Sequence, residues 1–239
     1  MTAAIPATAQ EKWQPLAPEI WSLSYQFKNM GLASSTRMTV IRLSDGSLLA
    51  HSAVPLTPEQ RAGLDELGPL RFIIAPSAMH HLFVSKVARL YPEAQLYGPA
   101  SVLSKRKDLP ALQLLPAQGE PAPWAADLSC MMWQGIPVLD ESVWFHHATG
   151  SLIVTDILQC WQGPLGLTTR LYLGLTGGHE RLTVPRTVRL LVKDKAAVRA
   201  SAQALLKLPV QRVILLHNSM IEDLAAQRLA EALSIWTTA

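Results

Sequence analysis

The stretch Val143–Asp156, VWFHHATGSLIVTD, contains two apolar segments separated by a turn, and it decides how the rest of the chain is interpreted. Ser142–His147 and Ser151–Thr155 are predicted to be neighbouring strands, because each is short and apolar and Thr149-Gly150 between them is typical of a turn. The second strand runs directly into Asp156. A charged carboxylate beside a buried strand is costly unless it has a partner, so Asp156 indicates a polar site at this strand end.

Two other apolar runs are followed by metal-compatible side chains in the same way. Arg71–Ala75 (RFIIA) precedes an adjacent pair of histidines, and Val210–Leu216 (VQRVILL) leads directly into a third. In an α/β protein the loops outside the carboxyl ends of strands form the usual ligand crevice, so side chains far apart in sequence can converge there. Neutral imidazole and carboxylate are ligands that zinc, iron and manganese accept. The sequence therefore predicts a metal site built from His80, His81, Asp156 and His217.

Each of these positions also has an explanation that involves no metal. Asp156 could cap the segment that follows it, His217 could end its strand before a helix, and His80-His81 could begin a helix. These explanations do not account for metal-compatible side chains at all three strand ends, so the metal site is the preferred hypothesis. The pair His146-His147 is predicted to lie at the hairpin tip, on opposite faces of a strand and away from Asp156.

Composition and charge favour a globular protein in a reducing compartment. Of 239 residues, 49% are hydrophobic and 16% are charged, and the net charge of +3 gives no sign of a nucleic-acid partner. The densest basic group, Lys105-Arg106-Lys107, is interpreted as a solvated helix end. Cys130 and Cys160 have no metal-type spacing and make no disulfide framework. Met1–Gln10 does not resemble a secretory signal and no apolar run could span a bilayer, so we expect a cytoplasmic protein without a membrane partner.

The chain is expected to hold one domain of two halves, each with strands followed by helices. Residues 1–20 are interpreted as an N-terminal extension and residues 21–239 as the domain. The first half is predicted to follow the order ββαβαβ. In the second half, helices are predicted over Lys193–Leu208 and over Ser219–Leu233, the latter with Ser219 and Glu222 as a capping box.

Four segments carry a resemblance that covers nearly the whole chain, from about Trp21 to Leu233: Arg37–Leu43 (RMTVIRL), Ala75–Phe83 (APSAMHHLF), Val143–Asp156 and Arg212–Asn218 (RVILLHN). In order and spacing they resemble the metallo-β-lactamase superfamily, and more closely one branch of it that is described as a domain of unknown function. The resemblance implies a four-layer αββα sandwich, in which two mixed sheets face one another with helices outside.

Carried over residue by residue, the resemblance implies that one of the superfamily's two metal sites is lost. Pro76 and Ala78 stand where the first two histidines of the superfamily's motif belong, and no histidine occurs near Gly135–Pro137, where another ligand is expected. The positions that match the second metal are His80, which stands in place of an aspartate, and His81, Asp156 and His217.

We therefore expect one metal centre, with His81, Asp156 and His217 as ligands and His80 as a fourth ligand or a supporting group. Zinc is the preferred metal, with iron or manganese as alternatives, and the expected function is metal-assisted hydrolysis of a small molecule. The alternative is a family member that has lost catalysis, holds no metal and uses the same crevice to bind a ligand or partner. The sequence leaves the substrate and the oligomeric state open.

Overall fold

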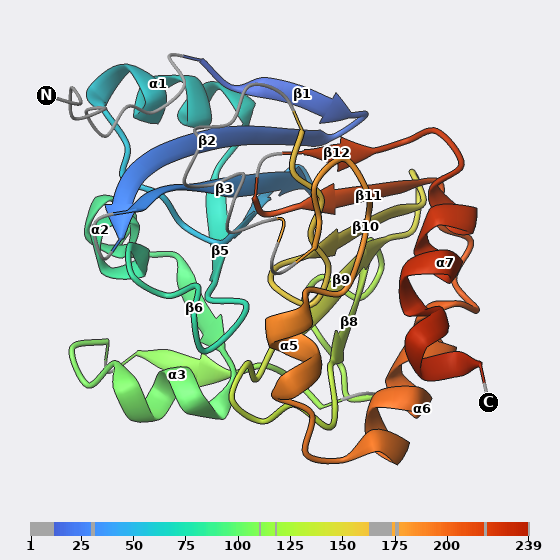
Figure 1. The fold of residues 1–239 in the computed structure, drawn as a ribbon. Helices are drawn as coiled ribbons and strands as arrows, with labels where there is room; N and C mark the ends of the chain where they lie inside the picture. The colour runs from blue at the N-terminus through green and yellow to red at the C-terminus, as the bar shows by residue number, and fades with distance from the viewer. Residues whose placement is uncertain are drawn as a thin grey trace, which may run out of the picture.

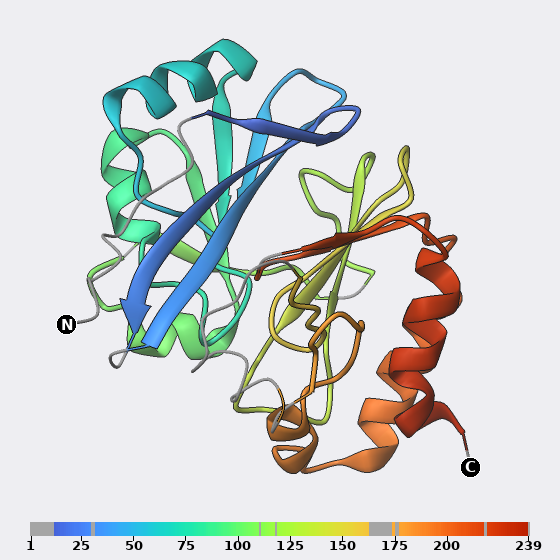
Figure 2. The same cartoon turned by 45° about the horizontal axis from the view of Figure 1, so that its top comes forward.

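Two β-sheets lie face to face with helices on both outer sides (Figures 1 and 2). The structure is a computed structural model, and it describes residues 12–29, 32–109, 111–117, 119–162, 174, 177–217 and 219–238. The expected four-layer αββα sandwich is confirmed.

The first sheet contains seven strands in chain order: β1 (Gln14–Ala17), β2 (Ile20–Asn29), β3 (Leu32–Arg42), β4 (Leu48–His51), β5 (Leu70–Ile74), β6 (Gln95–Gly98) and β7 (Leu112–Leu114). Strands β1 to β4 pair antiparallel and β4 to β7 pair parallel. The parallel strands are connected, as parallel strands require, by crossover helices: α1 (Pro58–Leu67), α2 (Val84–Leu90) and α3 (Ala100–Lys105). Because β1 pairs with β2, Gln14–Ala17 and Ile20 of the expected N-terminal extension are part of this sheet.

The second sheet contains five strands in the order β12 (Met220–Ile221), β11 (Arg212–Leu215), β10 (Ser151–Val154), β9 (Ser142–His146) and β8 (Leu128–Met132). Strands β10 and β11 pair parallel, and the other pairs are antiparallel. Its outer side carries α6 (Lys195–Leu205) and α7 (Ala225–Thr237), and α5 (Arg186–Leu190) lies near one end (Figure 1). The helix predicted over residues 193–208 is thus confirmed as α6, which Asp194 caps by accepting from the Ala197 N–H.

Apolar side chains fill the space between the sheets and the space between each sheet and its helices. Along β5, Phe72 and Ile74 face the second sheet, where they join Trp144, whereas Ile73 faces the helices. A strand that is buried on both faces carries a continuous apolar run, which is the pattern seen in the sequence of this strand.

The last helix begins later than the sequence predicts. Ser219 donates its hydroxyl to the carbonyl of Cys160, and Glu222 forms an ion pair with Arg212, so neither residue caps a helix. The backbone continues into β12, which pairs with β11, and α7 begins only at Ala225. The predicted capping box is therefore wrong, because strand pairing uses the backbone groups that the helix would need.

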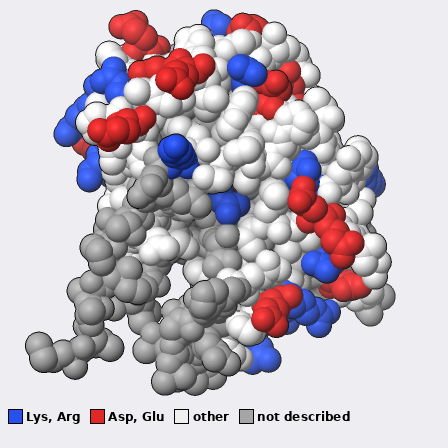
Figure 3. All heavy atoms as spheres, turned by 90° about the horizontal axis from the view of Figure 1, so that it is seen from above, with Lys and Arg blue, Asp and Glu red and all other residues white. Residues whose placement is uncertain are grey.

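Charged side chains of both signs lie on the surface. On the face shown in Figure 3, Lys and Arg side chains are interspersed with Asp and Glu around a largely uncharged centre. Both cysteines are free. Within the described ranges, no helix is long and apolar enough to cross a membrane.

Candidate metal centre

Asp156 and His217 are neighbours because their strands are parallel and in register. Val154 of β10 is paired with Leu215 of β11. Asp156 and His217 each lie two residues beyond that pair, past the ends of the two strands. The Leu216 N–H also donates to the Val154 carbonyl, at 3.2 Å. As a result the Nε2 atom of His217 lies 3.3 Å from Oδ1 of Asp156.

His80 reaches the same carboxylate from the opposite sheet. It lies in the loop after β5 of the first sheet, and its Nε2 atom is 3.0 Å from Oδ2 of Asp156. The side chains of His80, Asp156 and His217 are only 13%, 16% and 12% exposed. Their ligand atoms all lie within 4.8 Å of one another, and these three residues are the one such cluster of His, Cys, Asp and Glu in the described part of the chain.

The imidazole of His217 is held in one orientation and, in its neutral form, in one tautomer. Its Nδ1–H donates to the carbonyl of Ser35, at 2.5 Å, and because a carbonyl only accepts, Nε2 is the nitrogen left to face Asp156. Trp161 stacks on the ring, with ring centroids 5.6 Å apart and planes 12° from parallel. A backbone carbonyl behind a histidine is the usual support for a ligand that binds metal through its other nitrogen.

Burial and the neighbouring charges act in opposite directions on these groups. Burial opposes the ionisation of Asp156, but the charge of His80 and the hydrogen bonds from His217 and His80 outweigh it and hold the pKa of Asp156 well below its usual range. Burial alone would lower the pKa of His217, whereas the hydrogen bond and charge of Asp156 raise it above its usual value. The cluster therefore favours an ionised carboxylate between two imidazoles.

The donor set fits a single divalent metal ion. Ligand atoms that surround zinc tetrahedrally at about 2.0–2.1 Å lie roughly 3.3 Å from one another. Here one ligand atom from each of the three residues lies within 4.8 Å of the others, and the Nε2 atoms of His80 and His217 lie 3.0 and 3.3 Å from the two different oxygens of Asp156. Two imidazoles and one carboxylate also form a set that leaves a fourth position open, which is the arrangement of catalytic zinc sites.

The structure does not bring His81 into the cluster, although the sequence singled it out as a ligand. Its Nδ1 atom lies 3.4 Å from Nη1 of Arg106, and the same guanidinium donates to the His81 carbonyl. Burial lowers the pKa of His81, and the positive charges of Arg106 and Lys105 lower it further. Of the adjacent pair it is thus His80, expected as the fourth ligand or a supporting group, that faces Asp156.

Glu141 supports the Asp156 loop and was not singled out from the sequence. It is 1% exposed, and its carboxylate accepts from the backbone N–H groups of Thr155, Asp156 and Ile157 at 2.7, 3.0 and 3.0 Å. Burial and the charge of Asp156 raise the pKa of Glu141 to about 7. The only sequence signal is an acidic residue directly before a buried strand, where a charge requires partners.

The segment that contains Glu141, Leu139–Ser142, also holds the loop of His80. The carbonyl of Leu139 accepts from the Ala78 N–H at 2.9 Å. Ser142 donates to the carbonyl of Pro76 through both its N–H, at 2.7 Å, and its hydroxyl, at 2.8 Å. One short segment therefore fixes the two loops that carry His80 and Asp156.

The hairpin histidines lie outside the cluster, as the sequence predicts. His146 hydrogen-bonds with Thr149 through Nδ1, at 2.8 Å, and His147 hydrogen-bonds with Ser129 through Nε2, at 2.6 Å. We expect the double variant His146→Ala, His147→Ala to keep its metal content, measured by elemental analysis of the folded protein. Loss of metal from a variant with an unchanged circular dichroism spectrum would place these residues in the site.

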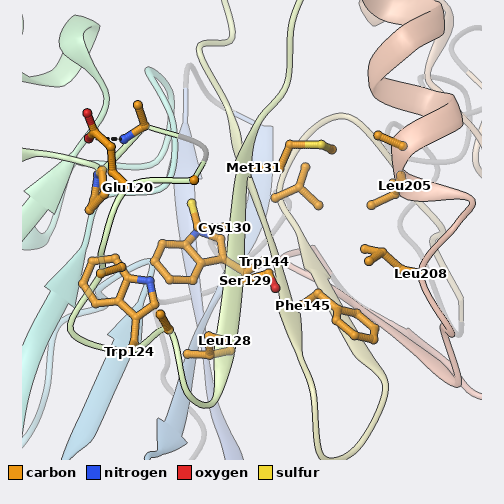
Figure 4. Close-up of a pocket in the computed structure, with 17 residues that line it drawn as sticks. Glu120, Trp124, Leu128, Ser129, Cys130, Met131, Trp144, Phe145, Leu205 and Leu208 are labelled. Carbon is orange, nitrogen blue, oxygen red and sulfur yellow. Dashed lines mark hydrogen bonds between the residues drawn. The ribbon is translucent and has the colours of Figure 1, made fainter.

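The cluster is also separate from a cavity of about 340 Å³ along β8. Figure 4 shows Trp124 and Cys130 on one side of this cavity and Leu205 and Leu208 on the other. None of the three clustered residues lines it. Its walls are largely apolar side chains of the β8 edge, the loop before β8 and the end of α6.

Comparison with solved structures identifies the fold. The metallo-β-lactamase from Pontibacter korlensis has a TM-score of 0.62 and 10% identity over 93% of this chain and 98% of that chain. FIM-1 from Pseudomonas aeruginosa, in its mono-zinc form, has a TM-score of 0.63 and 12% identity over 98% of both chains. The metallo-β-lactamase from Hirschia baltica has a TM-score of 0.60 and 13% identity over 92% of this chain and 96% of that chain. The fold is thus that of metallo-β-lactamases.

Comparison of sequences places the chain more narrowly. No curated protein sequence is similar enough to count as a match. One family model matches residues 17–162, which include strands β2 to β7 of the first sheet, the β9–β10 hairpin and two of the three clustered residues, His80 and Asp156. With more than half of its length matched, this metallo-β-lactamase-fold chain belongs to the family described as a domain of unknown function, DUF4336.

Proposed function

We propose that this protein is a mononuclear metal-dependent hydrolase that acts on a small molecule, with His80, Asp156 and His217 holding one divalent ion. The observation that carries the proposal is the convergence of three metal-compatible side chains from two sheets, with ligand atoms within 4.8 Å of one another. Zinc is the preferred ion for a set of two imidazoles and a carboxylate, and iron and manganese are the alternatives.

The surroundings of the cluster support hydrolysis that depends on the metal. A divalent ion supplies Lewis acidity, which polarises a carbonyl or phosphoryl group and lowers the pKa of water. The carboxylate of Glu141 accepts from three backbone N–H groups and is 1% exposed, so it is not placed to take a proton from a substrate. The residues of this chain would thus hold and orient the reacting groups.

Apolar side chains near the cluster are the basis for proposing a substrate with an apolar part. Met79 and Leu82 flank the His80-His81 pair in sequence and are 52% and 54% exposed. Trp161 adds an aromatic face beside His217. We infer that the substrate places a hydrolysable group near the metal and an apolar portion against these residues.

One metal is proposed, and not two, because the described residues contain one cluster of this kind. Pro76 and Ala78 occupy positions where the superfamily's first metal would need histidines. FIM-1, which has the same fold, was solved in a mono-zinc form, so one metal is compatible with this architecture. The same loss also favours the second candidate function, a binding module without catalysis.

Metal content separates these candidates. Protein purified without chelator is expected to contain about one equivalent of transition metal, and no more than one, by elemental analysis. The loaded protein should then hydrolyse at least one member of a panel of esters, thioesters, lactones and phosphodiesters, and His80→Ala should not. Two tightly bound metals per chain would contradict the ligand assignment. A chain that takes up no metal from excess zinc would favour the binding module.

A further inference from the structure

The basic group Lys105-Arg106-Lys107 does more than end a helix, because its first two members hold the loop of His80. Lys105 donates its Nζ–H to the carbonyl of Ala78, at 2.9 Å, and Arg106 donates an Nη1–H to the carbonyl of His81. These carbonyls lie two residues before and one residue after His80. The loop is therefore held on both sides of His80, its one residue that contacts the carboxylate of Asp156.

The carboxylate of Asp108 fixes the orientation of the Arg106 guanidinium, which contacts the loop of His80. Nε and Nη2 of Arg106 donate to Oδ1 and Oδ2 of Asp108 at 2.7 and 2.6 Å, a two-bond fork that leaves Nη1 directed at the loop. The side chain of Arg106 is 11% exposed, whereas that of Asp108 is 52% exposed. A guanidinium fixed in this way loses little further freedom when it binds the carbonyl, and a lysine ammonium could not make the same fork.

Helix α3, which ends directly before Arg106, is tied at its other end to the segment that holds Asp156. The Ser101 N–H, in the first turn of α3, donates to Oδ2 of Asp140 at 3.0 Å. Asp140 is the neighbour of Glu141, whose carboxylate fixes the backbone of Asp156. Helix α3 thus connects the loops of two of the three proposed ligands.

We propose that Arg106 and Asp108 are positioning residues of the metal centre, which hold His80 at the place where it meets Asp156 and so set the metal affinity. The proposal rests on the proposed function, because it concerns the same three ligands. Without Arg106 and Asp108, the loop of His80 would have to become ordered when the metal binds. The free energy cost of that ordering would make the free energy of metal binding less favourable. Loss of a supporting contact of this kind typically weakens metal binding about 10- to 100-fold.

The test compares Co²⁺ and Zn²⁺ affinities of the parent protein, Arg106→Gln, Arg106→Lys and Asp108→Asn. Titration of the metal-free proteins, followed by the Co²⁺ absorption spectrum and by Zn²⁺ competition, gives the dissociation constants. Arg106→Gln is expected to bind both ions roughly 10- to 100-fold more weakly. Arg106→Lys should be intermediate, because it can reach one carbonyl but cannot pair with both oxygens of Asp108. The double variant Arg106→Gln, Asp108→Asn should be no weaker than Arg106→Gln, because the two residues act as one unit.

A matched pair elsewhere in the chain provides the control. Arg212 also donates two bonds to one carboxylate, that of Glu222, at 2.8 and 2.6 Å, and its side chain is 19% exposed, but it contacts the start of β10 and not a ligand loop. Arg212→Gln should lower the melting temperature of the metal-free protein as much as Arg106→Gln does, and should leave the Co²⁺ affinity and spectrum unchanged.

The outcomes are distinguishable. If the parent binds Co²⁺ and the dissociation constant of Arg106→Gln is within twofold of the parent's, the positioning role is overturned and the proposed function stands. If Arg212→Gln weakens Co²⁺ binding as much as Arg106→Gln, the effect is general destabilisation and the positioning role is again overturned. If the parent binds neither ion, both proposals fail.

Discussion

Replacing Asp156 with alanine is expected to abolish the response of this protein's melting temperature to divalent metal. In the parent, an ion that binds only the folded state adds about 2.7 kcal/mol when its concentration is a hundred times the dissociation constant. For a chain of this length that corresponds to a rise of roughly 5–10 °C, which chelation should reverse and zinc or manganese should restore. Asp156→Ala removes the carboxylate that faces both imidazoles, so differential scanning fluorimetry should show one melting temperature with metal or chelator.

The surface variant Asp45→Ala is the control for loss of an aspartate. Asp45 accepts from the N–H and hydroxyl of Ser47 in an exposed turn, so its removal should cost stability and leave the metal response intact. If Asp156 served only as a cap, its removal would cost about 1 kcal/mol with or without metal. A parent protein whose melting temperature ignores both chelator and added metal would sink the metal assignment.

Protonation of Asp156 and His217 makes the effect of metal on the melting temperature depend on pH. The folded-state pKa of Asp156 is lowered, so its stabilising contribution is present above the unfolded value of 3.8 and is lost as pH falls through the folded pKa. The pKa of His217 is raised, so its contribution is complete below 6.5 and is lost as pH rises through the folded pKa. Metal competes with the proton on His217. Stabilisation by zinc should therefore increase as the pH rises from 5 towards 8, in the parent and not in Asp156→Ala.

Glu141→Ala is expected to destabilise the protein severely and to lose metal as well. The change leaves three buried N–H groups of the Asp156 loop without their acceptor, and each such group costs about 1–3 kcal/mol. The total, roughly 3–9 kcal/mol, should lower the melting temperature of the metal-free protein by about 6 °C or more. Chemical denaturation measures this loss, and a zinc titration of the folded fraction measures the loss of affinity.

Glu141→Gln distinguishes support of the loop from a mere need for volume. Oε2 of Glu141 accepts from both Asp156 and Ile157, and the amide oxygen of glutamine can take its place, which leaves only the Thr155 N–H opposite a donor. The glutamine variant should lie between the parent and Glu141→Ala. Glu120 is the control, because it accepts one backbone N–H, that of Ala117, at an exposed position. Equal losses in Glu120→Ala and Glu141→Ala would contradict the role assigned to Glu141.

The sequence predicts the parts of this structure that depend on apolar runs. The runs before His80, Asp156 and His217 are β5, β10 and β11, and their burial is sufficient to place the residues that follow them at strand ends. Since β10 and β11 are parallel, the same logic brings Asp156 and His217 together. The αββα layers follow from the order of strands and helices together with the family resemblance.

The choice between His80 and His81 could not be made in this way. Adjacent residues in a loop point in different directions, and which one faces Asp156 is decided by the carbonyls on either side of His80 and by the cations of a helix end about 25 residues away. Glu141 is equally hidden, because its partners are backbone N–H groups that no residue type reveals. The capping box at Ser219 failed for a related reason, since the pairing of β12 with β11 overrides a local signal.

The division of the strands between the sheets has a consequence for how the chain is assembled. Among the described residues, the strands up to β7 lie in one sheet and those from β8 onward lie in the other, so the strand order changes from the first sheet to the second once, between β7 and β8 (Figure 2). His80 belongs to the first half of the chain, and Asp156 and His217 belong to the second. Cleavage of a single peptide bond between β7 and β8 would put His80 on one polypeptide and Asp156 and His217 on another. Metal binding would then require the two pieces to stay associated, so the bound metal would report their association.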